Sequence, residues 1–207
     1  MSAAMTTTDT GVLQWLQLLQ LASPSLPIGG FAWSQGLESA IEQGWLKNEA
    51  DFSAWVQGVL QHAFVWQEIP LLARLHAAAC VNDTESLQHW NAVTLALRET
   101  SELRQEDVQM GGALLRLMRD LAFPQALTWS QKDISYVAAF ALACAQHRIP
   151  LQQAMTGFVW SWLENQIAAA LKLFPLGQTA GQRVFQQIAP LIEPVIVQAL
   201  QVEDDEI

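Results

Sequence analysis

Apolar residues recur at intervals of three and four along almost the whole chain, which is the pattern of amphipathic α-helices. The first such run, residues 11–22, reads GVLQWLQLLQLA and stops before Pro24, because the residue preceding a proline disfavours helical geometry. Its regularly spaced apolar side chains are Val12, Trp15, Leu16 and Leu19.

Prolines, glycines and capping residues divide the remaining sequence into further helices. We expect helices to begin at Ser34, with Gly44 at the end, at Asn48, with Asp51 three residues later, and at Pro70. Other helices cover 83–97 and 101–121. A further helix follows a Ser130-x-x-Asp133 capping box, and another runs from Pro150 to Pro175-Leu176-Gly177. One or two C-terminal helices follow, with breaks at Pro190 and Pro194.

No run alternates with period two for long enough to form a strand, and no Asn-Gly or Asp-Gly hairpin signal is present. The sequence therefore predicts an all-α fold with a single compact domain of about eight to ten helices. We expect residues 1–10 to be disordered, residues 11–200 to form the helical domain, and residues 201–207 to form an acidic tail.

Composition restricts the possible partners. Hydrophobic residues occupy 51% of the 207 positions and charged residues only 14%, so the surface is either neutral and polar or apolar and covered by partners. The net charge of −10 and the lack of any Lys/Arg cluster argue against nucleic-acid binding. Part of the acidity lies in Glu203-Asp204-Asp205-Glu206, which we expect to be a solvated tail.

The sequence carries no sign of export or membrane insertion. The N-terminus lacks the basic and apolar regions of a signal peptide, and the uncharged stretch 149–163 is shorter than the ~20 residues of a membrane span. We therefore expect a cytoplasmic protein. Cys80 and Cys144 lie in alanine-rich apolar settings, which favours buried free thiols over a disulfide or a metal pair.

Signatures of catalysis are missing. The sequence has neither the Gly-Lys pair of a phosphate-binding loop nor a Gly-x-Ser-x-Gly nucleophile motif. We interpret the four histidines as isolated residues rather than zinc or nickel ligands; they are His62, His76, His89 and His147. The sequence thus predicts no catalytic residue, no metal site and no directly bound cofactor, while a cysteine nucleophile with a distant histidine stays open.

Three segments depart from the plain helical pattern. The first is the proline–glycine segment, Ser23–Glu38 (SPSLPIGGFAWSQGLE), in which prolines limit the freedom of the chain and Gly29-Gly30 permit tight turns. Its apolar side chains are expected to pin it to the core; they are Leu26, Ile28, Phe31 and Trp33. A rigid recognition element is the interpretation that fits both features.

The second is the charged segment, Arg98–Asp107 (RETSELRQED), with six charged residues in ten. Spacings of four (Arg98 to Glu102) and three (Arg104 to Asp107) favour a solvated, self-paired helix face, and a recognition surface is the alternative. Gly111-Gly112 follow it and would weaken a helix by roughly 1 kcal/mol each, which suggests close approach of another backbone.

The third segment is Trp162–Arg183 (WLENQIAAALKLFPLGQTAGQR), where Glu164, Asn165 and Gln166 interrupt an apolar helix. Small residues follow them, which permits close packing against another helix. Lys172 comes just before the end of this helix, where the helix dipole favours a cation. The pattern indicates a close helix–helix interface with a few specific hydrogen bonds.

Together these segments resemble the urease accessory protein UreF family. The resemblance is carried by SLPIGGFAWSQGLESAIEQGWL, RETSELRQEDVQMGGALLRL and WSWLENQIAAALKLFPLGQTAGQR, in the family's order, from about Leu18 to about Val184. It implies a non-enzymatic, all-α, dimeric chaperone of urease maturation that binds a second accessory protein, UreD (also called UreH). The complex would recruit the GTPase UreG to apo-urease, so that nickel and GTP act through partner proteins.

The resemblance also implies partner-binding residues. Within the matching motifs, Gln35, Glu38 and Lys172 would form the GTPase-facing surface, and Gln178 belongs to the same set. Glu102 and Arg104 would orient either the dimer or a partner, and no arginine finger is expected. Family members usually continue beyond Glu203–Ile207 with a segment that helps to bind UreD, so we expect that contact to be reduced here. Two alternatives remain, a thiol-dependent helical enzyme and a dimerisation module without a GTPase link.

Overall fold

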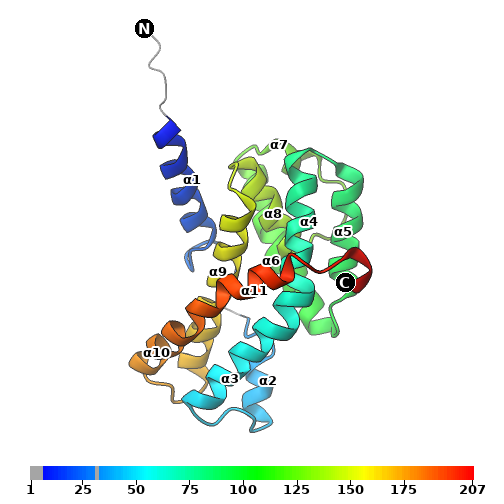
Figure 1. Cartoon of the computed structure of the whole chain (residues 1–207). Coiled ribbons are helices and arrows are strands. Elements are labelled where there is room, and N and C mark those ends of the chain that lie inside the picture. Colours follow the sequence, from blue (N-terminus) through cyan, green and yellow to red (C-terminus); the bar gives the residue numbers. More distant parts are fainter. Residues whose placement is uncertain (1–6, 31–32) are drawn as a thin grey trace.

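The computed structural model describes residues 7–30 and 33–207, and α8 (Tyr136–Gln146) lies at the centre of their arrangement. All nine residues from Tyr136 to Cys144 are buried, because α8 is apolar on every face. α4 (Ile69–Cys80) and α6 (Ser101–Asp120) pack along it, and α5 (Thr84–Ala96) packs against both α4 and α8. Figure 1 shows these four helices as one bundle.

The long helix α9 (Leu151–Leu173) organises the other half of the molecule. α1 (Thr7–Leu21), α2 (Leu37–Glu42), α10 (Gln178–Ile188) and α11 (Ile192–Ala199) all pack against it, and α3 (Glu49–Val59) packs against α10 (Figure 1). Short elements complete the chain: α7 (Pro124–Thr128), η3 (Ala189–Leu191) and η4 (Asp204–Glu206).

Pro70 lies in the first turn of α4, as predicted, but no loop separates this helix from the one before it. α3 continues through the π-helical segment η2 (Leu60–Glu68) directly into α4, with helical backbone angles at both junctions. Because the helix is continuous here, the missing N–H of Pro70 removes one hydrogen bond to the preceding turn. The wider turns of η2 precede it and carry the chain into α4 without a loop.

The all-α prediction is confirmed: residues 7–30 and 33–207 contain no strand, and nine of their α-helices are eight residues or longer. The predicted caps at Asn48, which accepts from Asp51 N–H, and at Gly44, which has φ +72°, are confirmed. Helix α1 begins at Thr7, inside the segment expected to be disordered.

Four predicted helix boundaries are wrong. α2 begins after Gly36 rather than Ser34, because two left-handed residues, Gln35 and Gly36, precede it. Ser135, not Ser130, caps α8 by accepting from Ala138 N–H. Pro150 is the residue before α9 rather than its first residue, and Pro194 lies inside the first turn of α11 without breaking it.

Gly111 confirms the predicted close approach of a second backbone. A Cβ atom at this position would lie 2.3 Å from the Ile134 carbonyl oxygen, which belongs to the strand-like stretch leading into α8. At Gly112 the nearest atom would be Arg116 Nη1 at 3.6 Å, an ordinary contact. Only the first glycine is therefore required by packing, and it allows α6 to lie directly against the start of α8.

Helix α1 presents most of its apolar residues to solvent. Gln14 donates to the Arg148 carbonyl, and Leu18 packs into the space left by Gly157 on α9. The opposite side carries the α1 stripe, which is Val12, Leu13, Trp15, Leu16 and Leu19, each 49–60% exposed. The regular apolar spacing read from the sequence thus marks an outward face rather than a core face.

Candidate functional site

The three unusual segments meet around one cavity of about 720 Å³. The proline–glycine segment supplies Leu26, Ile28 and Gln35, and the buried Leu26 together with the partly buried Ile28 and Trp33 confirms that it is pinned to the core. Phe31, also expected to pin it, lies outside the described residues. The charged segment, α9 and residues 54–68 of α3 and η2 contribute much of the remaining wall, so segments distant in sequence form one junction.

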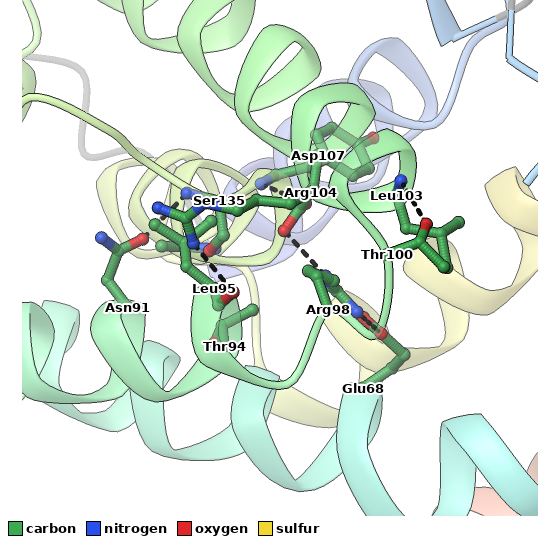
Figure 2. Close-up of polar contacts among 12 residues, drawn as sticks. Glu68, Asn91, Thr94, Leu95, Arg98, Thr100, Leu103, Arg104, Asp107 and Ser135 are labelled. Carbon is green, nitrogen blue, oxygen red and sulfur yellow. Dashed lines mark hydrogen bonds and ion pairs between the residues drawn. The ribbon is translucent and has the colours of Figure 1, made fainter.

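Arg98 links the elements at this junction. Its Nε donates to Asp107 Oδ2 at 2.9 Å, and its other nitrogens donate to both carboxylate oxygens of Glu68, at 3.2 Å for Oε2 (Figure 2). Asp107 Oδ1 also accepts from Tyr136 N–H at 2.8 Å. Glu68 ends η2, Arg98 precedes α6, Asp107 lies on α6 and Tyr136 starts α8, so one ion-pair cluster ties four parts of the fold together.

Burial and the neighbouring carboxylates act in opposite directions on the pKa of Arg98. Burial acts to lower the pKa of Arg98, but Glu68 and Asp107 outweigh it and hold that pKa above its usual value. Charge-assisted hydrogen bonds of this kind are strong because the surroundings exclude water. The sequence-based pairing within the charged segment is therefore wrong: Arg98 is inside the protein with partners from other elements, not on a solvated face with Glu102.

Glu106 is the buried carboxyl without a cationic partner in contact. It is 6% exposed and its Oε1 has no hydrogen-bond partner within the described part of the chain. Burial, reinforced by the neighbouring Asp107, raises the pKa of Glu106 to about 7, although Gln35 and Arg98 act to lower it. This side chain is therefore divided between its neutral and charged forms at physiological pH.

Two amides on α9 fix the end of the proline–glycine segment. Asn165 donates to the Trp33 carbonyl at 3.1 Å, and Gln166 donates to the Ser34 carbonyl and to Gln35 Oε1, both at 3.3 Å. Gln35 itself has φ +49°, a strained conformation for a residue other than glycine. The predicted specific hydrogen bonds are present, but they join α9 to the proline–glycine segment rather than to a second helix, and they hold Gln35 at the cavity.

The predicted partner-binding residues fall into two groups. Glu38, Lys172 and Gln178 are exposed; Glu38 lies on α2, which packs against α9, and the other two flank the turn between α9 and α10. Glu102 and Arg104 lie at the start of α6. Arg104 donates to the Leu95 carbonyl at 2.8 Å and lies 3.4 Å from Asp133 Oδ2 (Figure 2).

The Arg104 contacts correct a second sequence-based pairing. The spacing of three suggested Asp107 as its partner, but Asp107 points inward to Arg98 while Arg104 lies on the outer side of α6. Arg104 instead joins α5 to the stretch before α8. Its exposed guanidinium still belongs to the surface, whereas Gln35 is half-buried at the cavity.

The sequence did not lead us to one residue pair, His76 and Cys80, although a spacing of four residues on a helix could have revealed it. Cys80 Sγ lies 3.7 Å from His76 Nδ1, and His76 Nε2 donates to the Ile149 carbonyl. Burial raises the pKa of Cys80 and lowers that of His76, so both groups favour their neutral forms. This electrostatic setting opposes the thiolate that a nucleophilic cysteine needs.

The cysteines differ in exposure. Cys144 is fully buried on α8, as predicted, and burial raises its pKa well above the usual range. Cys80 is exposed because it is the last residue of α4, which corrects the prediction of a buried thiol. Both are free, and no group of three or more His, Cys, Asp or Glu side chains suited to a metal ion occurs among the described residues.

The C-terminal acidic block is partly attached rather than simply solvated. Arg74 donates to the Val202 carbonyl at 2.8 Å and pairs with Asp204 at 2.6 Å, while η4 itself is exposed. No helix in residues 7–30 and 33–207 has the length and apolarity that crossing a membrane requires. The described chain is thus a helical protein whose distinctive features are a buried polar junction and an outward apolar helix face, a combination typical of proteins that act through partners.

Comparisons with known proteins agree with this class. The sequence profile of the UreF family matches residues 46–189. A urease accessory protein UreF from Marinobacter nauticus is 46% identical over 197 residues, covering 95% of this chain and 85% of its own. Those from Alkalilimnicola ehrlichii and Pseudoalteromonas translucida are 46% and 45% identical, each covering 97% of this chain and 88% and 87% of their own. The chain belongs to the UreF family of urease accessory proteins.

Proposed function

We propose that this chain is a non-enzymatic scaffold in urease maturation that binds the accessory protein UreD and, in that complex, brings the GTPase UreG to apo-urease. Nickel and GTP then act through the partners rather than at a site on this chain. Its place of action is the cytoplasm, where urease is assembled. The observation that carries the proposal is membership in the UreF family over nearly the whole length of the chain.

The structure supports a role in assembly through its surface. The α1 stripe exposes five large apolar side chains on one helix, more than an isolated surface position needs. Covering such a face by a partner removes apolar area from water and favours association. We propose that the α1 stripe is one of the contacts by which this chain joins UreD or a second copy of itself in a homodimer.

A separate surface serves the GTPase in this proposal. Glu38 and Lys172 are exposed. Gln35 precedes Glu38 in the chain, and Gln178 follows Lys172 at the start of α10. Glu102 and Arg104 lie on α6 and orient a partner or the dimer. Charged residues on a surface of this kind contribute specificity and association rate more than affinity.

The proposal is tested first by reconstitution. Apo-urease, UreD, UreG, nickel and GTP are incubated with and without this chain, and urease activity is measured together with co-purification of the four proteins. We expect a stable complex and an activation that depends on this chain. Equal activation without it would contradict the proposed function.

The residue assignment needs its own variants. Lys172→Ala and Glu38→Ala should reduce UreG recruitment while leaving UreD binding unchanged, and Lys47→Ala and Glu85→Ala serve as exposed controls of the same residue types. Unchanged recruitment by both test variants would remove these residues from the GTPase surface without affecting the scaffold role. Loss of UreD binding in the same variants would instead place them at the other interface.

A further inference from the structure

The cavity at the junction holds polar atoms that the fold itself does not satisfy. Glu106 Oε1 and the Trp55 indole N–H have no hydrogen-bond partner in the described residues, and both side chains line the cavity. The Tyr136 hydroxyl likewise has no hydrogen-bond partner among the described residues, although Ser161 is close enough to act on its pKa. Buried polar groups are normally bonded, so three unpaired groups on side chains that line one cavity indicate a place for a ligand.

Apolar side chains, several of them aromatic, form part of the cavity wall. They include Leu26, Trp55, Phe64, Met110, Phe158 and Trp162. A hollow of about 720 Å³ lies in the range that takes a small organic molecule. The aromatic rings offer faces both to an apolar ligand body and to a positive charge.

The excess of carboxylates in the cavity lining favours a positively charged ligand. Its lining contains the carboxylates of Glu68, Glu99, Glu106, Asp107 and Glu164, but only one arginine and no lysine. That arginine, Arg98, is already shared by Glu68 and Asp107. Glu106 is left as the buried carboxyl that a cation would stabilise, whereas an anion would meet only further negative charge.

We propose that this cavity binds a small organic cation, a primary amine on an aromatic or alkyl body, with the ammonium on Glu106 and the body between the aromatic walls. In the proposed pose the ammonium, which carries three donors, bonds to the Glu106 carboxylate and to the hydroxyl oxygens of Tyr136 and Ser161. The carboxyl end of the cavity sets the orientation of the ligand, and the walls set its size. This inference does not depend on the proposed role in urease maturation.

Binding depends on pH because the ammonium prefers the ionised carboxylate. Burial raises the pKa of Glu106 to about 7, so the carboxyl must release a proton before it binds a cation at lower pH. With this pKa, affinity at pH 6 is about tenfold lower than at pH 8. The other titratable or charged groups that line the cavity are Glu68, Arg98, Glu99, Asp107, Tyr136, Glu164 and His62.

The test is a titration of the purified full chain with 2-phenylethylamine and with hexylamine, followed by calorimetry and tryptophan fluorescence. We expect saturable binding of at least one amine, and at least tenfold weaker binding of the matched alcohols, 2-phenylethanol and hexanol. Glu106→Gln should weaken amine binding at pH 8 by at least tenfold and remove its pH dependence, whereas the surface control Glu85→Gln should leave both unchanged.

Three results would overturn the assignment: no saturable binding of either amine, equal binding of amine and alcohol, or wild-type amine binding by Glu106→Gln. Tyr136→Phe gives an independent variant in case Glu106→Gln does not fold, because it keeps the ring and removes one acceptor. It should weaken amine binding severalfold and leave alcohol binding less affected. Unchanged amine affinity in a folded Tyr136→Phe protein would contradict the proposed pose.

Discussion

The start of α6 and helix α1 depart from the usual distribution of residues in opposite directions. At α6 the ion-pair cluster of Arg98, Glu68 and Asp107 lies inside the protein. At α1 the stripe of large apolar side chains faces solvent. Charged groups inside and apolar groups outside each carry a free-energy cost for the isolated chain, so each region needs a separate explanation.

The free-energy costs of the buried charges and of the exposed apolar side chains are offset in different ways. Every acceptor of the cluster is matched by a donor from another element, so the buried charges fix how η2, α6 and α8 meet. Such pairs add little net stability compared with apolar packing, but breaking one leaves an uncompensated charge. The α1 stripe has no such compensation from the part of the chain that the structure describes. In the proposed function association removes this cost, so the first region would serve the fold and the second would serve binding.

The largest effect should come from breaking the cluster. Arg98→Met keeps much of the side-chain volume but leaves Glu68 and Asp107 buried side by side without their cation. We expect the free energy of unfolding to fall by about 3–5 kcal/mol, measured by urea denaturation. The exposed control Arg183→Met removes the pair between Arg183, whose side chain is 53% exposed, and Glu49, and should lower stability far less. Similar losses in both variants would remove the distinction between buried and exposed pairs.

Glu106 should make stability depend on pH. Its pKa of about 7 in the folded chain lies above the unfolded value of 4.5, so the folded state binds more protons between these values. Stability contributed by the neutral carboxyl is therefore complete below pH 4.5 and is lost as pH rises to 7. Because solvent screens part of this effect for a carboxyl that lines a cavity, we expect a loss of roughly 2–3 kcal/mol rather than the full shift.

The measurement compares wild type with Glu106→Gln, which cannot titrate. Between pH 5 and pH 8, wild type should lose stability relative to the variant in urea denaturation. Parallel pH profiles for the two proteins would show that Glu106 is ionised throughout, and the cavity would then be more hydrated than its burial indicates.

The glycine pair separates tight packing from helix propensity within α6. Gly111→Ala places a Cβ against the Ile134 carbonyl oxygen, so overpacking should outweigh the gain in helix propensity and lower stability by about 1–2 kcal/mol. Gly112→Ala meets no such contact and should raise stability by up to about 1 kcal/mol. Thermal unfolding of the two variants, which differ at adjacent positions, should show changes in stability of opposite sign. A stabilising Gly111→Ala would mean that α6 and the start of α8 can move apart easily.

The sequence predicted features that depend mainly on residues close to one another in the chain. Asn48 and Gly44 delimit helices through local hydrogen bonds and backbone angles, and Gly111 was expected to mark a close approach. The partners of Arg98 could not be read in this way, because Glu68 is 30 residues away on another helix and the spacing within the charged segment favoured local pairs. Ser130 likewise fits a capping motif, but tertiary contacts placed the cap at Ser135.

The same limit applies to the candidate site. The three segments were recognised as unusual from their composition, but only the fold brings them to one cavity and places Gln35 against Gln166. The spacing in α1 predicted an apolar face without saying whether that face meets the core or solvent. Periodicity gives the presence of such a face, and the packing of Leu18 against Gly157 decides its direction.

The smallest effect on stability, and the sharpest test of the comparison, is expected at the α1 stripe. The double variant Leu16→Gln/Leu19→Gln changes side chains that are 57% and 58% exposed, so the free energy of unfolding should change by no more than about 0.5 kcal/mol. Association should nevertheless weaken at least tenfold, measured as self-association by sedimentation and as UreD binding by calorimetry. Gln20→Ala, an exposed polar position on the same helix, is the matched control.

The alternative outcome is equally specific. If the double variant unfolds more easily by several kcal/mol, as expected for the buried Leu18→Ala, the stripe supports the fold and α1 packs more extensively than its exposure indicates. If both stability and association are unchanged, the stripe is neither core nor interface, and the contrast with the Arg98 cluster fails. Only unchanged stability with weakened association supports the view that apolar side chains outside this protein serve its partners while the charges inside serve its fold.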